Sequence, residues 1–262
     1  MASPLSIEDF TLTKRLASGK YGKVYRCFRK SDDRCFAVKV QRRTELLRQN
    51  VDFTAEARLH AAAAKSSPYV IGLEVAFDDE SRHYLLLEHA ARGDLYDFIQ
   101  RWPIPTTFIQ RWMRQIAEAL VDCSRVGILH RDIKPENILI TGQWQARLAD
   151  FGHSCNAPTS LQQCGTLDYL CPQKAAGRLY DSGSDVWAFG VVLYECCCGE
   201  LPFTGLRWAQ TYANIQAAAP PYPATIPLAA QDLLKRIFVV DPAHRIPLAA
   251  LLQHPFLSIT LP

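Results

Sequence analysis

The sequence has no long apolar run. Its longest nearly apolar stretch, at 186–198, has 13 residues and contains Glu195, so it is too short and too polar for a membrane-spanning helix. The first ten residues, MASPLSIEDF, lack the apolar core of a secretory signal. These absences predict a globular protein of the cytoplasm or the nucleus that has no membrane partner.

Paired C-x-x-C spacings, internal repeats and low-complexity linkers are also absent. The nine cysteines are an odd number, and three of them are consecutive in ECCCGE at 195–200. We interpret the cysteines as reduced thiols rather than as a disulfide framework. With 48% hydrophobic residues, the chain can bury a sizeable core.

Charge of both signs is present but unevenly distributed. Between Lys14 and Arg48, twelve Lys or Arg residues accompany three acidic ones, a net charge of +9, whereas the remainder carries −6. This stretch forms either solvated strand edges and turns or a basic surface for phosphate or an acidic partner. Because it has no recognised binding motif, we do not expect nucleic acid as a direct partner.

Hydrophobic periodicity predicts an α+β chain. It predicts three antiparallel strands within 10–40, a helix over 44–65 and two further strands over 70–77 and 83–89. Six helical patterns follow, at 94–101, 106–126, 184–198, 205–217, 228–238 and 246–253. We expect a small antiparallel-sheet lobe with one main helix over 1–90 and a larger, mainly helical lobe over 91–262, joined near 88–93.

The strongest motif is HRDIKPEN at 130–137, a charged turn expected between a helix and a strand. It places an acid, a base and an amide at the fixed offsets that phosphoryl transfer uses. Asp132 can accept the proton of an attacking hydroxyl, and Lys134 can neutralise charge on the transferred group. Asn137 can hold a metal ion through its carbonyl oxygen. A charged loop that caps a helix is the alternative for this turn taken alone.

Three further motifs support the same chemistry. In ADFG, Asp150 follows Asp132 by 18 residues and can hold Mg²⁺ at nucleotide phosphates. In FAVKV, Lys39 lies on the third expected strand, and Glu56, 17 residues later, is a candidate ion-pair partner that would direct the lysine at the α and β phosphates. In ASGKYGKV, backbone N–H groups near two glycines can approach phosphate closely; these are Gly19 and Gly22.

In this order, the four motifs resemble those of the eukaryotic protein kinase superfamily, over residues 10–257. CGTLDYL, DFGHS followed by AP, and HRDIKPENILI resemble the Aurora kinases most, with the Polo-like and cyclic-AMP-dependent kinases as neighbours. The resemblance implies a two-lobed kinase fold, ATP and Mg²⁺ as cofactors, protein substrates and a monomer. It also implies a mitotic role at the spindle, centrosome or centromere, and an activator protein that docks on the small lobe.

The resemblance also implies roles for individual residues in nucleotide binding. Core packing is the alternative role for the apolar ones among them. By similarity, eight residues would line the nucleotide site: Leu16, Val24 and Ala37 above the adenine and Leu139 below it, Leu87 as gatekeeper, Glu88 and Ala90 through their backbone, and Asp94 at the ribose or a basic substrate residue.

The same resemblance indicates the substrate class. Lys134, two residues after Asp132, is the Ser/Thr-kinase arrangement, and Thr166 supports it. Glu136 and Glu195 match positions that bind an arginine two residues before the phosphoacceptor in basophilic relatives. Such pairs are charge-assisted and strong. A helix-end carboxylate is the alternative role for Glu195.

The chain departs from the Aurora pattern in its activation loop. Aurora kinases have basic residues and a phosphorylated threonine just before CGT, where this chain has Gln162 and Gln163. Arg131 would ordinarily pair with that phosphate. Three explanations remain: Thr159 or Ser160 supplies the phosphate, the glutamine amides order the loop, or a partner protein does so.

Two other departures concern structure. Ala17 stands in place of the usual first glycine of the turn, which we expect to alter nucleotide affinity rather than to abolish activity. Gln173 replaces a glutamate that pairs with a buried arginine in the family, here expected to be Arg245. Asp185 of SDVWAFG matches the residue that supports the catalytic loop from beneath.

The sequence thus predicts an active Ser/Thr kinase, with a nucleotide-binding pseudokinase scaffold as the alternative.

Overall fold

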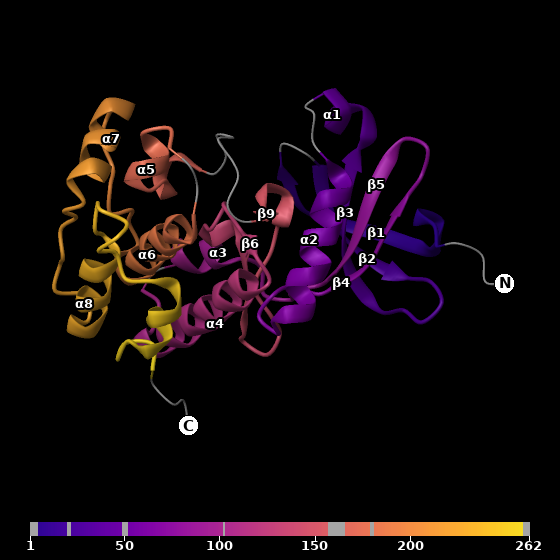
Figure 1. Ribbon diagram of the computed structural model, residues 1–262. Coiled ribbons are helices and arrows are strands. Elements are labelled where there is room, and N and C mark those ends of the chain that lie inside the picture. Colours follow the sequence, from indigo (N-terminus) through magenta and orange to yellow (C-terminus); the bar gives the residue numbers. More distant parts are fainter. Residues whose placement is uncertain are drawn as a thin grey trace.

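The computed structural model describes residues 5–19, 22–48, 52–101, 103–156, 166–178 and 181–258. Its first part is a five-stranded antiparallel sheet with the strand order β1-β2-β3-β5-β4 (Figure 1). The strands are β1 (Phe10–Gly19), β2 (Gly22–Arg29), β3 (Cys35–Arg42), β4 (Leu73–Asp78) and β5 (Arg82–Glu88). The structure therefore contains all five strands that the sequence predicts.

The fourth strand begins later than the sequence predicts. Val70 forms a parallel bridge with Leu148, and the N–H of Ile71 donates to the carbonyl oxygen of Leu148 at 2.9 Å. Leu148 belongs to the larger lobe. These two apolar residues thus connect the lobes and do not extend the small sheet.

The two faces of the sheet have different environments. Tyr25, Val38 and Leu86 lie opposite one another in neighbouring strands, on the face whose buried core includes Phe10 and Tyr84. Successive side chains of a strand point to opposite faces. The residues between them, among them Lys39, therefore face the other side, toward the larger lobe.

Two helices replace the single helix predicted over 44–65. They are α1 (Arg43–Arg48) and α2 (Phe53–Ser66). The second helix begins after Asp52, whose side chain accepts hydrogen bonds from the N–H groups of Thr54 and Ala55 at 3.0 and 3.1 Å. This N-cap satisfies orphan donors of a new helix. The composition of 44–65 correctly predicted helical residues. It did not predict that the N-cap Asp52 begins a second helix.

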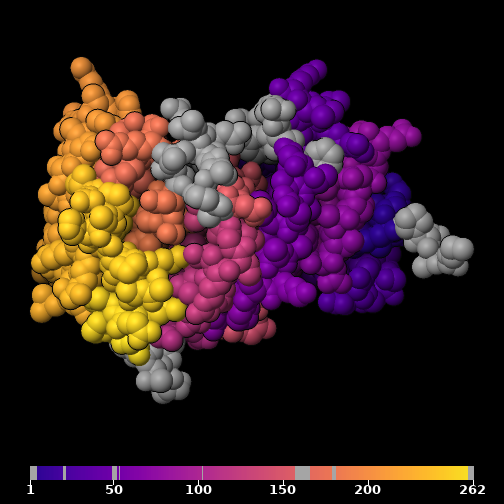
Figure 2. Space-filling view, in the orientation of Figure 1, coloured from indigo at the N-terminus to yellow at the C-terminus, as the bar shows by residue number. Residues whose placement is uncertain are grey.

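Helix α2 lies between the small sheet and the larger lobe (Figure 1). Its residues Leu59 and Ala63 are buried in the same core as the helices of the larger lobe. The two lobes are in contact across the strip where α2 meets that lobe (Figure 2). Helix α2 is therefore in contact with both lobes.

The larger lobe is mainly helical. Its helices are α3 (Leu95–Ile99), α4 (Thr106–Arg125), α5 (Pro172–Ala175), α6 (Ser182–Cys198), α7 (Trp208–Ala217) and α8 (Leu228–Ile237). The segment 246–253, predicted as a helix, is a 3₁₀ helix over Leu248–Gln253 that follows Pro247. Four short strands form two ribbons: β6 (Ile128–Leu129) with β9 (Cys155–Asn156), and β7 (Ile138–Ile140) with β8 (Ala146–Leu148).

Helix α6 forms the centre of the larger lobe. Residues 184–197 are all buried, as expected for a helix that is apolar on nearly every side. Asp181 caps its N-terminus by accepting from the N–H of Ser184 at 2.9 Å. Gly199, with φ of 76°, ends it in the left-handed conformation that favours glycine.

This arrangement is the two-lobed α+β fold that the sequence predicts. Strand β5 ends at Glu88 and α3 begins at Leu95, so the expected junction at 88–93 falls between them. The division into 1–90 and 91–262 stays a prediction. Among the described residues, no helix is both long and apolar enough to cross a membrane.

Candidate active site

A cleft of about 280 Å³ lies between the small sheet and the larger lobe. Strands β1, β2, β3 and β5 supply its upper wall, and residues around β7 supply its floor. All eight residues that the resemblance assigns to the nucleotide line this cleft: Leu16, Val24, Ala37, Leu87, Glu88, Ala90, Asp94 and Leu139. The structure thus brings the proposed nucleotide contacts together.

Lys39 lies at the inner end of the cleft and contacts two carboxylates. Its Nζ atom lies 2.6 Å from Oε1 of Glu56 and 2.8 Å from Oδ1 of Asp150. Burial alone lowers the pKa of this lysine, but the two carboxylates outweigh burial and raise it. For Asp150, burial alone raises the pKa, but the positive charge of Lys39 outweighs burial and holds this pKa low. Lys39 and Asp150 are therefore both charged at neutral pH.

Glu56 is held in place by a second partner. The amide Nε2 of Gln41 donates to Oε2 of Glu56 at 3.0 Å. The sequence interpretation missed Gln41, although it follows Lys39 by two residues on the same strand. Because side chains two apart share a face of a strand, that spacing could have identified it.

The backbone of the ADFG motif directs Asp150 into the cleft. Asp150 has φ of 61°, a left-handed conformation that is uncommon for residues other than glycine. Its side chain caps the 3₁₀ helix Phe151–His153. Phe151 is buried between the rings of His60 on α2 and His130, with ring centroids 4.8 and 4.9 Å away. Packing of the phenylalanine thus fixes the position of the aspartate beside it.

Asp132 lies in a network of hydrogen bonds across the catalytic loop. The amide Nδ2 of Asn137 donates to its carbonyl oxygen at 2.8 Å and to Oδ2 at 3.0 Å. Nζ of Lys134 lies 2.8 Å from Oδ2. The hydroxyl of Thr166 donates to Oδ1 at 3.3 Å and accepts from Lys134 at 3.0 Å. The four predicted residues thus form one cluster.

The catalytic loop is supported from beneath by Asp185 on α6. Its two carboxylate oxygens accept from the N–H groups of His130 and Arg131, both at 3.0 Å. Arg131 is buried and has φ of 73°. A non-glycine residue persists in this conformation only where its surroundings impose it. The buried carboxylate supplies that constraint, in agreement with the structural role expected for Asp185.

Glu195 and Glu136, the predicted arginine-binding pair, influence one another electrostatically. Glu195 is buried and accepts from the hydroxyl of Tyr169 at 2.7 Å, whereas Glu136 is exposed at the cleft. Burial raises the pKa of Glu195 to about 7, with smaller contributions of the same sign from Glu136 and Asp168. The hydrogen bond from Tyr169 opposes this rise in the pKa. The sequence analysis did not predict Tyr169 as a partner of Glu195.

Gly19 and Gly22 do not line the cleft. They pair with each other at the closed end of the β1–β2 hairpin, and a Cβ atom on Gly22 would collide with the carbonyl oxygen of Val40. Glycine is therefore needed at position 22 for the hairpin to lie against β3. A role for the two glycines at phosphate stays a prediction.

Gln173 contacts the buried arginine that the resemblance identified. Its Oε1 accepts from Nη2 of Arg245 at 2.8 Å, and its Nε2 donates to the carbonyl oxygen of Val240. Arg245 also donates to the carbonyl oxygens of Gly183 and Val239. A neutral amide thus accepts a hydrogen bond from the guanidinium where the resemblance implies a carboxylate. The glutamines of the activation loop and its two candidate phosphorylation sites lie outside the described residues: Gln162, Gln163, Thr159 and Ser160.

Six residues of the cleft were not predicted. They are Lys14, His60, Ile71, Gly93, Asp97 and Ala149. His60 lies one helical turn after Glu56, a spacing that places both on one face of α2. Ile71 has no comparable signal, because its position depends on the contact with the larger lobe.

The protein kinase domain family matches residues 10–257 of the chain. Because this match covers nearly the whole sequence and the structure has the corresponding fold, the chain belongs to the protein kinase family.

Within this family, the chain is most like the Aurora kinases and is of the Ser/Thr class. It is 34% identical to Aurora kinase B of Mus musculus, over 97% of this chain and 74% of that protein. It is 37% identical to Aurora/IPL1-related protein kinase 2 of Caenorhabditis elegans, over 95% of this chain and 83% of that protein. It is 34% identical to Aurora kinase A-A of Xenopus laevis, over 96% and 62% respectively.

Proposed function

We propose that the chain is an active enzyme that transfers the γ-phosphate of ATP to Ser or Thr hydroxyls of proteins. The observation that carries this proposal is the contact of Lys39 with both Glu56 and Asp150. These residues come from β3, α2 and the ADFG motif. The lysine that we propose directs phosphate, the glutamate that would orient it and the carboxylate that would bind metal are therefore in contact.

The residues of the cleft fit ATP and Mg²⁺, which the protein kinase family uses. Apolar side chains such as Leu16 and Leu139 offer flat surfaces for a purine, and Lys39 offers a fixed positive charge for phosphate. Asp150 and Asn137 offer a carboxylate and an amide oxygen, the hard ligands that Mg²⁺ prefers. When bound, Mg²⁺ would offset negative charge on the phosphate oxygens.

Asp132 is the proposed base. It already accepts a hydrogen bond from one hydroxyl, that of Thr166, and a substrate hydroxyl can bind to the same carboxylate. Asn137 fixes its orientation through two hydrogen bonds. Lys134, 2.8 Å from Asp132, would neutralise charge on the phosphoryl group as it moves.

The activity test is transfer of labelled phosphate from ATP to serine and tyrosine peptides, with Mg²⁺ and with excess chelator. We expect transfer to the serine peptide only, and its loss with the chelator. Transfer that persists without divalent metal would contradict the roles of Asp150 and Asn137. Nucleotide binding with no transfer to any peptide would instead support a pseudokinase scaffold. The presence of Asp132, Lys134 and Asn137 argues against that alternative.

We further propose that Glu136 and Glu195 select an arginine two residues before the phosphoacceptor. The charge of Glu136, at the cleft, raises the pKa of Glu195, which supports this proposal because a guanidinium can pair with two neighbouring carboxylates. The test compares kcat/KM for paired peptides with arginine or alanine at that position. We expect the arginine peptide to be favoured about tenfold or more, and Glu136→Gln to reduce the preference. Equal values for the two peptides would contradict this selectivity.

The likeness to Aurora kinases supports a role in mitosis at the spindle, centrosome or centromere, with an activator protein on the small lobe. Fluorescent tagging of the chain in dividing cells tests this proposal. We expect accumulation on these structures during mitosis. A uniform distribution throughout the cell cycle would contradict it.

A further inference from the structure

The chain itself contains two positions that match the selectivity for arginine proposed above. Of all its serines and threonines, only Ser31 and Thr44 follow an arginine by two residues. Thr159 and Ser160 of the activation loop do not. An enzyme with this selectivity would therefore act on its own activation loop less readily than on one of these two positions.

The arginine that precedes Ser31 is already bound to a carboxylate. Its Nε lies 2.9 Å from Oδ1 of Asp32, and its Nη2 lies 2.6 Å from Oδ2 of the same residue. Ser31 also lies in a tight turn, in which the N–H of Asp33 donates to the carbonyl oxygen of Arg29 at 2.8 Å. A guanidinium that is held in this way is not available to the carboxylates of an enzyme. The geometry therefore disfavours Ser31.

Thr44 and its arginine are both accessible. Arg42 is the last residue of β3, Thr44 is the second residue of α1, and both are exposed. Among the described residues, Arg42 forms no ion pair. Helix α1 has six residues, of which Leu46 alone is buried, and a helix of this length has little stability of its own. The segment can therefore open locally and enter a cleft in an extended form.

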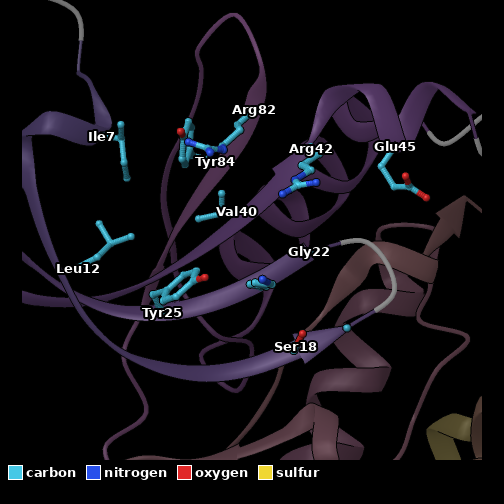
Figure 3. A pocket seen from close by; sticks show the side chains of 12 residues that line it. Ile7, Leu12, Ser18, Gly22, Tyr25, Val40, Arg42, Glu45, Arg82 and Tyr84 are labelled. Carbon is cyan, nitrogen blue, oxygen red and sulfur yellow. The ribbon is translucent and has the colours of Figure 1, made fainter.

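The surroundings of Thr44 favour a negatively charged group. Arg48 follows it by four residues, so the two side chains lie on the same face of α1. Arg42 lies directly opposite Arg82 in β3 and β5, and like charges at opposed positions of a sheet are unfavourable. Both arginines line the hollow near the start of α1 that Figure 3 shows. Glu45 is the one acidic residue of α1. A phosphate on Thr44, with a charge of about −2, would offset these positive charges.

We propose, on the basis of the activity and the selectivity proposed above, that a second copy of this chain phosphorylates Thr44. Glu136 and Glu195 of that copy bind Arg42. The hydroxyl oxygen of Thr44 forms a bond to the γ-phosphorus of ATP, the bond from that phosphorus to the β,γ-bridging oxygen breaks, and ADP leaves. The proton of the hydroxyl passes to Asp132.

The fold requires that this transfer takes place between two copies. Figure 1 shows α1 at the edge of the small lobe, whereas Asp132 lies in the catalytic loop of the larger lobe. Arg42, two residues before Thr44, is paired with Arg82 in the sheet. The hydroxyl of Thr44 therefore cannot reach Asp132 of its own chain while β3 stays in the sheet. The initial rate per chain should accordingly rise with the concentration of the chain.

The test uses the natural chain as the enzyme and the full Asp132→Asn chain as the substrate, and mass spectrometry locates the phosphate. Three further substrates add Thr44→Ala, Arg42→Gln or Arg48→Gln. The last is the matched control, because it removes an exposed arginine of the same segment that does not precede a serine or threonine by two residues. Melting curves check that each variant is folded. Peptides of residues 40–47 with arginine or alanine at position 42 test the same recognition without the fold.

We expect phosphate on Thr44 of the Asp132→Asn chain and the loss of most of the label with Thr44→Ala. Arg42→Gln should slow the transfer about tenfold or more, as should alanine at position 42 of the peptide. Arg48→Gln should change the rate little. The phosphorylated chain should melt about 1–3 °C higher than the unphosphorylated chain, and Arg48→Gln should reduce this difference.

A separate serine peptide, with arginine two residues before the serine, reports whether the enzyme is active. Transfer to this peptide with no phosphate on Thr44 would overturn the proposal and leave the proposed activity intact. Equal slowing by Arg42→Gln and Arg48→Gln would indicate a diffuse effect of charge, and no slowing by Arg42→Gln would show that this arginine is not recognised. Either result would overturn the proposal. No transfer to the peptide or to the chain would contradict the proposed activity and, with it, phosphorylation of Thr44 by a second copy.

Discussion

For the carboxyl group of Glu195, a rise in pH has opposite effects on stability and on the role that we propose for it in substrate recognition. In the folded chain its pKa is about 7, against 4.5 for the free group, chiefly because it is buried. The folded chain therefore keeps a proton that the unfolded chain releases between about pH 4.5 and 7. Through this group, the free energy of unfolding falls as pH rises across that window. The same rise in pH produces the ionised carboxylate that an arginine can bind.

Replacement of Glu195 by glutamine should separate these two effects. We expect the stability of Glu195→Gln relative to the natural chain to increase from about pH 5 to about pH 8, because the burial cost of the carboxylate is removed. In the natural chain, KM for the arginine peptide should fall as pH rises through about 7, and KM for the alanine peptide should not. Thermal unfolding and initial rates at several pH values measure both. A pH-independent difference in stability would contradict the account.

The contact of Gln173 with Arg245 leads to a second prediction at this scale. Arg245 is buried among neutral acceptors, and burial lowers its pKa. Gln173→Glu would supply a charged partner at the same position and should raise the free energy of unfolding by about 1 kcal/mol. Gln173→Ala, which loses both hydrogen bonds, should lower it by about 1–2 kcal/mol. Chemical unfolding measures both free energies. A Gln173→Glu variant that is less stable than the natural chain would contradict this interpretation.

Among the secondary-structure elements, α2 links the small sheet to the larger lobe. It carries Glu56 for the ion pair with Lys39 and His60 for the packing of Phe151. Its composition predicted a helix, but the sequence interpretation joined it to α1. The division depends on Asp52, whose side chain caps α2. A capping residue within a helical pattern is a recognisable signal, so this boundary was within reach of the sequence.

The cap of α2 should affect both stability and activity. Asp52→Ala removes the acceptor for the N–H groups of Thr54 and Ala55, and we expect a loss of about 1 kcal/mol in the free energy of unfolding. Turnover should fall as well, because fraying of the first turn loosens Glu56. Asp52→Asn, which keeps an acceptor oxygen, serves as the control. If alanine and asparagine variants melt at the same temperature, the cap contributes nothing.

At the scale of the whole molecule, the spacing of the motifs predicted more of the candidate site than any single residue did. Lys39 and Asp150 are 111 residues apart in the sequence, yet their predicted roles at phosphate and metal required them to lie close together. Contacts between the lobes had no such signal. Ile71 pairs with the larger lobe because the sheet and α2 place it there, and only the assembled fold shows this.

The contacts of Lys39 with Glu56 and Asp150 support the proposal that the chain is an active kinase. The central claim is that the chain is a working kinase. It is tested most directly by phosphate transfer from ATP to a serine peptide, with phosphatase-treated chain and with Asp132→Asn as the control. We expect turnover by the natural chain and a loss of at least about a hundredfold in kcat for Asp132→Asn. Turnover equal in both, or ATP binding without any turnover, would contradict the account.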